Sequence, residues 1–343
     1  MKKKGKAGSV KRSLLSALIV VLAIILIGLV AGTAYMESVL NLIGRQEEDE
    51  KLSASDYEQL LEEQKGEKDP NFQGTVIDPN DVQLDTQAGA VENSQNIINI
   101  MLIGQDRRPG QGRQRSDAMI LCTINTEKKT LIMTSFLRDT YIDMPDYRGE
   151  VFDDNRLNAC YVFGGMEMLN DALEMNFGVT VDHNIEVDFA GFQNIVNVFG
   201  GVGIELTEAE AAIVQGGAKA GWNHLNGEQA LNYARIRSLD GDTNRTYRQR
   251  KLLMSMFESI RNLRLDQMRD LVNAVFPMVT TDMTNADMLH YLFAFFPLIT
   301  DLEITTQYIP ANGTAENVMI RGMAVKVPDL EENRRILKET LGE

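Results

Sequence analysis

Short apolar runs bounded by glycine or polar residues recur along most of the chain and predict strands. Three of them, at 97–104, 118–124 and 130–136, are almost continuously apolar, as buried strands require. Apolar residues at helical spacing follow at 159–178, and Gly178 is expected to end that helix, because glycine readily adopts the left-handed backbone of a helix C-terminus. Strand and helix patterns therefore alternate from residue 97 onward.

The same alternation continues toward the C-terminus. We expect a strand at 183–187 and a helix at 189–198, and then a helix that begins at Asn226, with Gln229 completing a capping box. The remaining expected elements are a helix from about Arg245, a helix at 282–296, a strand at 303–310 and a helix at 331–341. This order predicts the α/β class, as a three-layer α/β/α domain with a central mixed β-sheet.

The N-terminal part of the chain has a different pattern. Residues 13–36 carry no charge, and as a helix they would extend roughly 36 Å, enough to cross a hydrocarbon core of about 30 Å. Residues 1–12 carry six basic side chains and no acidic one, which favours a cytoplasmic N-terminus. We expect a cytoplasmic basic tail and one transmembrane helix in the cell membrane. A cleaved signal peptide is the alternative, although its apolar region would normally be shorter.

Residues 37–95 carry fifteen acidic and four basic side chains and few large apolar ones. Such a composition buries little surface, and we expect an acidic extracytoplasmic linker, whether it acts as a spacer or only as a solvated tail. Residues 96–343 then form an extracellular domain, large enough to bury a core.

Composition excludes several classes of function. The chain has 343 residues with 34 basic and 49 acidic side chains, a net charge of −15, which argues against nucleic acid as a partner. Two cysteines and three histidines argue against a disulfide-dense scaffold and against a zinc site. Cys122 and Cys160 fall in apolar segments and are expected to be buried thiols.

The first candidate site lies between the first two predicted strands. Asp106 follows one strand and Asp117 begins the next, so the two carboxylates could share one Mg²⁺ (or Mn²⁺) with substrate oxygens and water. Arg108, Arg113 and Arg115 lie between them and suit bidentate contacts with phosphate. An ordinary charged loop with surface ion pairs is the alternative interpretation.

Two further positions add cations. Arg138 follows the third strand, and ligands of α/β sheets gather at the carboxyl ends of strands. Arg235, Arg237 and Arg245 form a basic cluster beside an acidic loop, and in extended backbone the first two would point to one side. The last two cations of that segment are interpreted instead as part of a basic helix surface: Arg250 and Lys251. Carboxylates and arginines together are typical of phosphoryl chemistry.

The segments that carry these residues resemble, in their order, the LytR-CpsA-Psr (LCP) family. The resemblance is closest over 97–265, and its main segments are MLIGQDRR (101–108), RSDAMIL (115–121), FLRDTY (136–141), RLNACYVFGG (156–165), LNGEQALNYARIR (225–237) and RTYRQ (245–249). It implies a membrane-anchored, Mg²⁺-dependent phosphotransferase. Such an enzyme moves an anionic glycopolymer (teichoic acid, capsule or a related polymer) from a polyprenyl-pyrophosphate carrier to peptidoglycan and forms a phosphodiester.

The resemblance also implies roles for single residues. Asp106 and Asp117 would hold the metal. The pyrophosphate oxygens would be bound by a set of cations and one amide, namely Arg108, Arg115, Arg138, Arg235, Arg237, Arg245 and Gln249. The catalytic set would be Asp106, Arg108, Arg138, Arg235 and Arg237.

Three other functions remain open at this point. The same site could hydrolyse the pyrophosphate, with water in place of the sugar hydroxyl. It could bind the lipid carrier without turnover. The chain could also be a non-enzymatic transcriptional attenuator, although an acidic domain outside the membrane suits DNA binding poorly.

Overall fold

The structure, a computed structural model, describes residues 37–45, 74–86, 96–107, 113–261, 265–295 and 298–341. None of the helices in these ranges is both long and apolar enough to span a bilayer. The predicted transmembrane helix at 13–36 and the basic tail at 1–12 lie outside the described residues.

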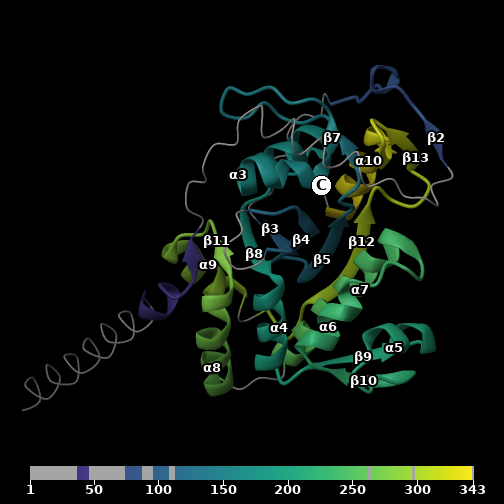
Figure 1. Cartoon of the computed structure of the whole chain (residues 1–343). Coiled ribbons are helices and arrows are strands. Elements are labelled where there is room, and N and C mark those ends of the chain that lie inside the picture. Colours follow the sequence, from purple (N-terminus) through teal and green to yellow (C-terminus); the bar gives the residue numbers. More distant parts are fainter. Residues whose placement is uncertain are drawn as a thin grey trace, which may run out of the picture.

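A seven-stranded mixed sheet forms the centre of the domain (Figure 1). The three apolar runs become adjacent antiparallel strands, and parallel strands extend the sheet on both sides. Across the sheet the strands are β1 (Gly44–Arg45), β11 (Thr280–Thr281), β8 (His183–Asp188), β3 (Ile97–Gln105), β4 (Ser116–Asn125), β5 (Thr130–Phe136) and β12 (Glu303–Ile309). The predicted central mixed sheet is confirmed.

Helices cover both faces of this sheet, as Figure 1 shows. Met101 and Ile103 of β3 belong to a core with α3 (Leu157–Phe177) and α10 (Leu330–Leu341). The alternate residue Ile100 faces a second core. On that face lie α4 (Phe189–Val198), α6 (Gly227–Ala234), α7 (Gly241–Arg261), α8 (Leu265–Val275) and α9 (Asn285–Phe295). Because side chains alternate along a strand, the continuous apolar runs serve both layers.

The predicted helix ends are also present. Gly178 ends α3 with a left-handed backbone (φ 70°) and its N–H bonds back to Glu174. At the start of α6, Asn226 and Gln229 form the reciprocal capping box. The helix expected at 282–296 begins later, at Asn285, because Thr284 caps it through the N–H of Asp287.

Several small elements have no clear sequence signal. The hairpin of β9 (Val202–Leu206) and β10 (Gly221–Leu225), with α5 (Glu208–Val214), lies at one end of the domain. A second sheet joins β14 (Met323–Pro328), β13 (Ala315–Ile320) and β2 (Thr75–Val76), while β6 (Tyr141–Ile142) pairs with β7 (Asn155–Arg156). Short 3₁₀ turns occur at η1 (Pro79–Asp81) and η2 (Phe276–Met278).

Two short strands of the predicted linker join these sheets: β1 pairs with β11, and β2 pairs with β13. Val39, Leu40 and Ile43 are buried beside β1. Parts of 37–95 therefore pack against the domain. Cys122 and Cys160 are free thiols, and burial raises the pKa of Cys122 to about 12.

Candidate active site

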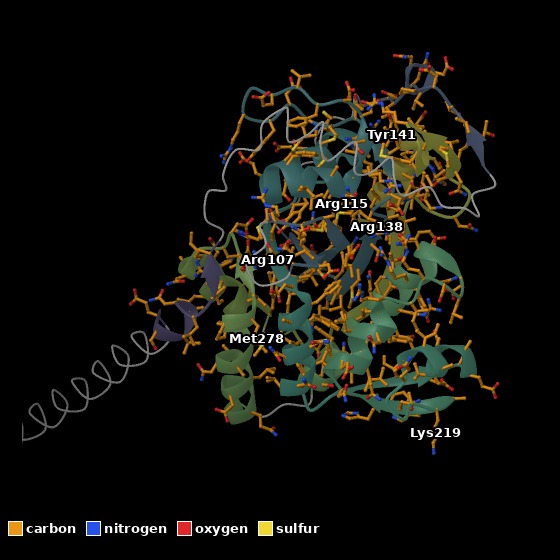
Figure 2. All side chains as sticks on the ribbon, viewed as in Figure 1. Arg107, Arg115, Arg138, Tyr141, Lys219 and Met278 are labelled. Atoms are coloured by element: carbon orange, nitrogen blue, oxygen red, sulfur yellow. The ribbon has the colours of Figure 1, made fainter. Side chains whose placement is uncertain are left out.

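The ends of the central strands bring the first candidate residues together. β3 and β4 are antiparallel with Gln105 opposite Ser116, so Asp106 and Asp117 lie at the same edge of the sheet. β5 ends at this edge too, and Arg138 follows it. The labelled arginines Arg107, Arg115 and Arg138 lie at this end of the strands in Figure 2.

The connection from α6 to α7 adds arginines from the other side. Arg235 is the C-cap of α6 with helical backbone (φ −98°, ψ −4°), so the expectation of extended backbone at this residue is wrong. The helix continues this far because the N–H of Arg235 still bonds to Leu231. Arg235 and Arg237 nevertheless line the same cavity.

Arginines and carboxylates form one network at this edge. Asp242, in the first turn of α7, lies 3.0 Å from Arg245, 3.5 Å from Arg237 and 3.7 Å from Arg138. Asp117 pairs with Arg138 and lies 3.7 Å from Arg245, whose Nη2 also donates to the Asp117 carbonyl at 3.0 Å. The network thus holds three cations around two half-buried or buried carboxylates.

The two most buried arginines of this network differ in their balance of charge. Burial acts to lower the pKa of Arg138, but Asp139, Asp117 and Asp242 outweigh it and raise the pKa. For Arg245 burial prevails and lowers the pKa, because Asp242 and Asp117 offset it only in part and Arg138 repels it. Arg245 is therefore a cation for which the protein provides too little negative charge, and an added anion would stabilise it.

Asp106 and Arg235 form a more open pair. Their side chains lie 3.7 Å apart, Arg235 is exposed and Asp106 is half-buried, and the Arg235 guanidinium stacks 4.8 Å above the ring of Phe189. Stacking on an aromatic ring orients a guanidinium while leaving its N–H groups free for a ligand.

A cavity of about 330 Å³ opens from this network into the layer between the sheet and the helices. Its polar end is lined by Asp117, Arg138, Arg235, Arg237, Arg245 and Gln249. The other lining side chains are almost all apolar and come from β3, β4, β8, α4, α6 and α7, including Leu102, Ile120, Ile185, Phe192, Ile195, Leu252, Leu253 and Met256. One end of this site suits an anion and the other a hydrocarbon.

Not every predicted residue lines the cavity. Arg108 lies outside the described residues, and Arg115 lies at the same edge but away from the cavity lining. Asp106 does not line the cavity either and reaches it only through its pair with Arg235. Arg113 is held by α3, since its Nη1 donates to the carbonyls of Tyr161 (3.4 Å) and Val162 (3.3 Å). Its proposed contact with phosphate is not supported by this position.

Arg250 was expected on a basic helix surface, and that interpretation is wrong. Its side chain is buried against the sheet and donates to the hydroxyl of Ser135 at 2.6 Å. Burial lowers its pKa to about 10. One turn of α7 faces β5 at this point, which the local sequence does not reveal.

Asp242 is the main site residue that sequence reasoning missed. An acidic residue in the first turn of a helix is common, because it is favourable for the helix dipole, so Asp242 carries no special signal. Its spacing of three residues before Arg245 was the available hint, since residues three apart share a helix face.

A metal would need ligands beyond the protein here. Within the described residues there is no group of three or more His, Cys, Asp or Glu side chains that could hold an ion. Mg²⁺ is commonly held by one or two carboxylates with substrate phosphates and water, so Asp106 and Asp117 fit that arrangement.

Comparison with known proteins identifies a family and similar members of it. The LytR_cpsA_psr family model matches residues 51–340. The "Polyisoprenyl-teichoic acid--peptidoglycan teichoic acid transferase TagU" of Enterococcus faecalis is 32% identical over 205 residues, 57% of this chain and 65% of that protein. The "Regulatory protein MsrR" of Staphylococcus aureus is 30% identical over 187 residues, 54% of this chain and 55% of that protein. The matched segment therefore spans less than two thirds of either relative.

Solved structures share the fold. The LytR-CPS2A-psr family protein YwtF (TagT) with bound octaprenyl pyrophosphate lipid has a TM-score of 0.55 and 23% identity, and the match covers 76% of this chain and all of that one. TagT of B. subtilis gives a TM-score of 0.58 at 23% identity, with the same shares covered. With the family model matching most of its length, this chain belongs to the LytR_cpsA_psr family.

Proposed function

We propose that this protein transfers an anionic glycopolymer from a polyprenyl-pyrophosphate carrier to peptidoglycan. The observation that carries the proposal is that one and the same cavity has arginines at one end and apolar walls at the other. A lipid pyrophosphate has the same division, with two phosphates at one end and a hydrocarbon chain at the other. The teichoic acid transferase TagU and the lipid-bound TagT are the relatives that support this choice of substrate.

Arg138, Arg237 and Arg245 would bind the pyrophosphate. Their guanidinium groups already surround Asp242, so they are oriented before substrate arrives. Burial, and after it repulsion from Arg138 and Arg237, lowers the pKa of Arg245, so a ligand with several negative charges would stabilise its charged form. Arg138 and Arg245 are largely buried, and burial strengthens their contacts with an anion.

We further propose that Asp106 and Asp117 hold a divalent cation such as Mg²⁺ or Mn²⁺. The cation would supply charge neutralisation at the pyrophosphate when bound. Asp117 is already oriented by Arg138 and Arg245, while Asp106 lies half-buried at the edge of the sheet beside Arg235.

The transfer itself would be a substitution at phosphorus. A sugar hydroxyl of peptidoglycan attacks the phosphate joined to the polymer, and the bond to the second phosphate breaks. Polyprenyl monophosphate leaves with that electron pair, and the hydroxyl proton passes to a carboxylate, for which the half-buried Asp106 is the candidate. Arg138 and Arg245 would stabilise the charge that develops during the substitution.

The expected location is the outer face of a cell membrane, with residues 13–36 as the anchor. This proposal rests on the uncharged length of that segment and on the basic residues before it.

The test uses the full-length chain in proteoliposomes with a polyprenyl-pyrophosphate-linked polymer, peptidoglycan and Mg²⁺. We expect polymer joined to peptidoglycan, and a loss of about 100-fold in Arg237→Gln. Arg335→Gln is the matched control, because Arg335 is an exposed arginine of α10 whose ion-pair partners among the described residues, Glu332 and Glu339, lie on the same helix. Free polymer without linkage would favour the hydrolase, and equal activity of the Arg237 variant and wild type would contradict the proposed site.

A further inference from the structure

A buried carboxylate lies behind the site and takes no part in lining the cavity. Glu186 is on β8 opposite Ile103 of β3, and its side chain is 8% exposed. Its two oxygens accept hydrogen bonds from the amide of Gln105 and the phenol of Tyr161. Arg107, one residue beyond Asp106, lies 3.5 Å away. A buried carboxylate is costly unless it is paired, so these partners account for its presence.

Gln105 extends this contact to both sides of the site. Its Nε2 donates to Glu186, and its Oε1 accepts the backbone N–H of Gln114 at 3.0 Å. Asp106 follows Gln105 directly, and Asp117 lies three residues after Gln114. One fully buried amide therefore ties together the two segments that carry the candidate metal ligands.

Tyr161 anchors the same segments to α3. Its hydroxyl donates to Glu186, its ring lies 5.7 Å from the Arg113 guanidinium, and Arg113 bonds to the backbone of the same turn. Burial, followed by the charge of Glu186, raises the pKa of Tyr161, so the phenol remains a donor at neutral pH. One continuous path of hydrogen bonds therefore connects α3, β8, β3 and the segment before β4. It runs from Tyr161 through Glu186 and Gln105 to Gln114.

We propose that Glu186 and Tyr161 are positioning residues that hold Asp106 and Asp117 at the separation needed to meet the pyrophosphate. The proposal rests on the proposed function of the site. Neither residue touches the cavity, so each acts through Gln105 and the segments it joins. An apolar pair at these positions would fill the same space but would leave Gln105 and Arg107 without their acceptor.

The test compares Glu186→Gln and Tyr161→Phe in the full-length chain. We expect kcat for transfer to fall about tenfold in each, with a much smaller change in KM for the lipid-linked donor, because a displaced carboxylate disturbs the reacting geometry more than lipid binding. Tyr161→Phe keeps the ring beside Arg113, so it preserves the packing and remains informative if Glu186→Gln fails to fold.

A double-mutant cycle separates positioning from general stability. In an Asp106→Asn background, Glu186→Gln should cause a smaller additional loss of kcat than in wild type, because one of the two carboxylates that it positions is already gone and only Asp117 remains. The control is Asp282→Asn, which removes a carboxylate that accepts the N–H of Asn184 (2.8 Å) at the opposite end of β8. We expect it to lower Tm without changing kcat. Equal, additive losses in both backgrounds would overturn the proposal.

Binding of inorganic pyrophosphate in the presence of Mg²⁺ keeps this test independent of turnover. If the wild-type protein transferred no polymer from any lipid-linked donor, the proposed function would be contradicted. The positioning role would then be decided by the Kd, which we expect to rise about fivefold in Tyr161→Phe and Glu186→Gln. An unchanged Kd in both variants would overturn it.

Discussion

Two arginines on one helix differ in how many hydrogen bonds and carboxylate partners the protein provides for them. Arg245 and Arg248 lie three residues apart on α7 and are equally buried, with 4% and 5% of their side chains exposed. Arg248 donates to Glu210 at 2.8 Å, to both oxygens of Asp240 at 2.8 and 2.6 Å, and to the carbonyl of Ile236. Arg245 donates to one carbonyl and has one carboxylate at 3.0 Å and a second at 3.7 Å, and its Nε has no hydrogen-bond partner within the described part of the chain.

The pKa directions follow the same difference. Burial acts to lower the pKa of both, but the hydrogen bonds that Arg248 donates to Asp240 and Glu210 outweigh it and raise the pKa of Arg248. At Arg245 the pKa is lowered. An arginine whose N–H groups and charge are paired within the protein stabilises the fold. An arginine whose charge is only partly compensated is available to bind an anionic ligand. Burial alone would not separate the two roles.

The largest expected effect is on catalysis. Arg245→Gln should reduce transfer about 100-fold, because one donor to the developing charge is lost. The free energy of unfolding should change by less than about 1 kcal/mol, since the variant also removes an undercompensated buried cation. Steady-state transfer assays and urea unfolding of the same preparation measure both. Loss of stability without loss of activity would reverse the roles assigned to the two arginines.

The next effect is on stability. Arg248→Met should destabilise the fold by about 3 kcal/mol, because Glu210 loses its buried partner and Asp240 its bidentate one. The fraction that remains folded should retain a KM close to that of wild type. A stable Arg248→Met protein with impaired turnover would contradict the comparison.

The smallest effect sharpens the comparison through pH. Burial acts to raise the pKa of Glu210, but the bonds from Thr207 and Arg248 outweigh it and lower the pKa. A carboxylate with a lowered folded-state pKa adds stability above its unfolded pKa, and this stability is lost as the pH falls through the folded value. Wild-type Tm should therefore fall on acidification below the usual carboxyl range, and Glu210→Gln should show a shallower fall. If Tm fell with pH equally in wild type and in Glu210→Gln, Glu210 would not contribute to the loss of stability in acid.

The sequence predicts the part of the fold that depends on local pattern. The continuous runs at β3, β4 and β5 and the caps at Gly178 and Asn226 are recognisable because each depends on neighbouring residues alone. The β9–β10 hairpin is not, since Trp222 is 75% exposed and its ring covers Gly203, where a Cβ would come within 2.4 Å. A glycine that makes room for an exposed tryptophan resembles neither a buried strand nor a typical turn.

The site divides in the same way. Asp106, Asp117, Arg138 and Arg245 were recognisable from their positions at strand ends and in a basic cluster. The contributions of Arg113 and Glu186 depend on carbonyl and phenol groups far along the chain, on α3. Tertiary packing decides whether these two side chains point inward toward α3 or outward toward the cavity, and the local sequence carries no signal for it.

The short strand β1 determines where the chain enters the domain. Gly44 donates its N–H to the carbonyl of Val279 at 3.0 Å, and Val279 is also part of the apolar wall of the cavity. With residues 13–36 as a membrane anchor, the tether would meet the domain beside the hydrocarbon-lined wall. The lipid bilayer that supplies the substrate would then lie on the tail side of the cavity, so the hydrocarbon chain of a bound carrier lipid could stay close to the membrane.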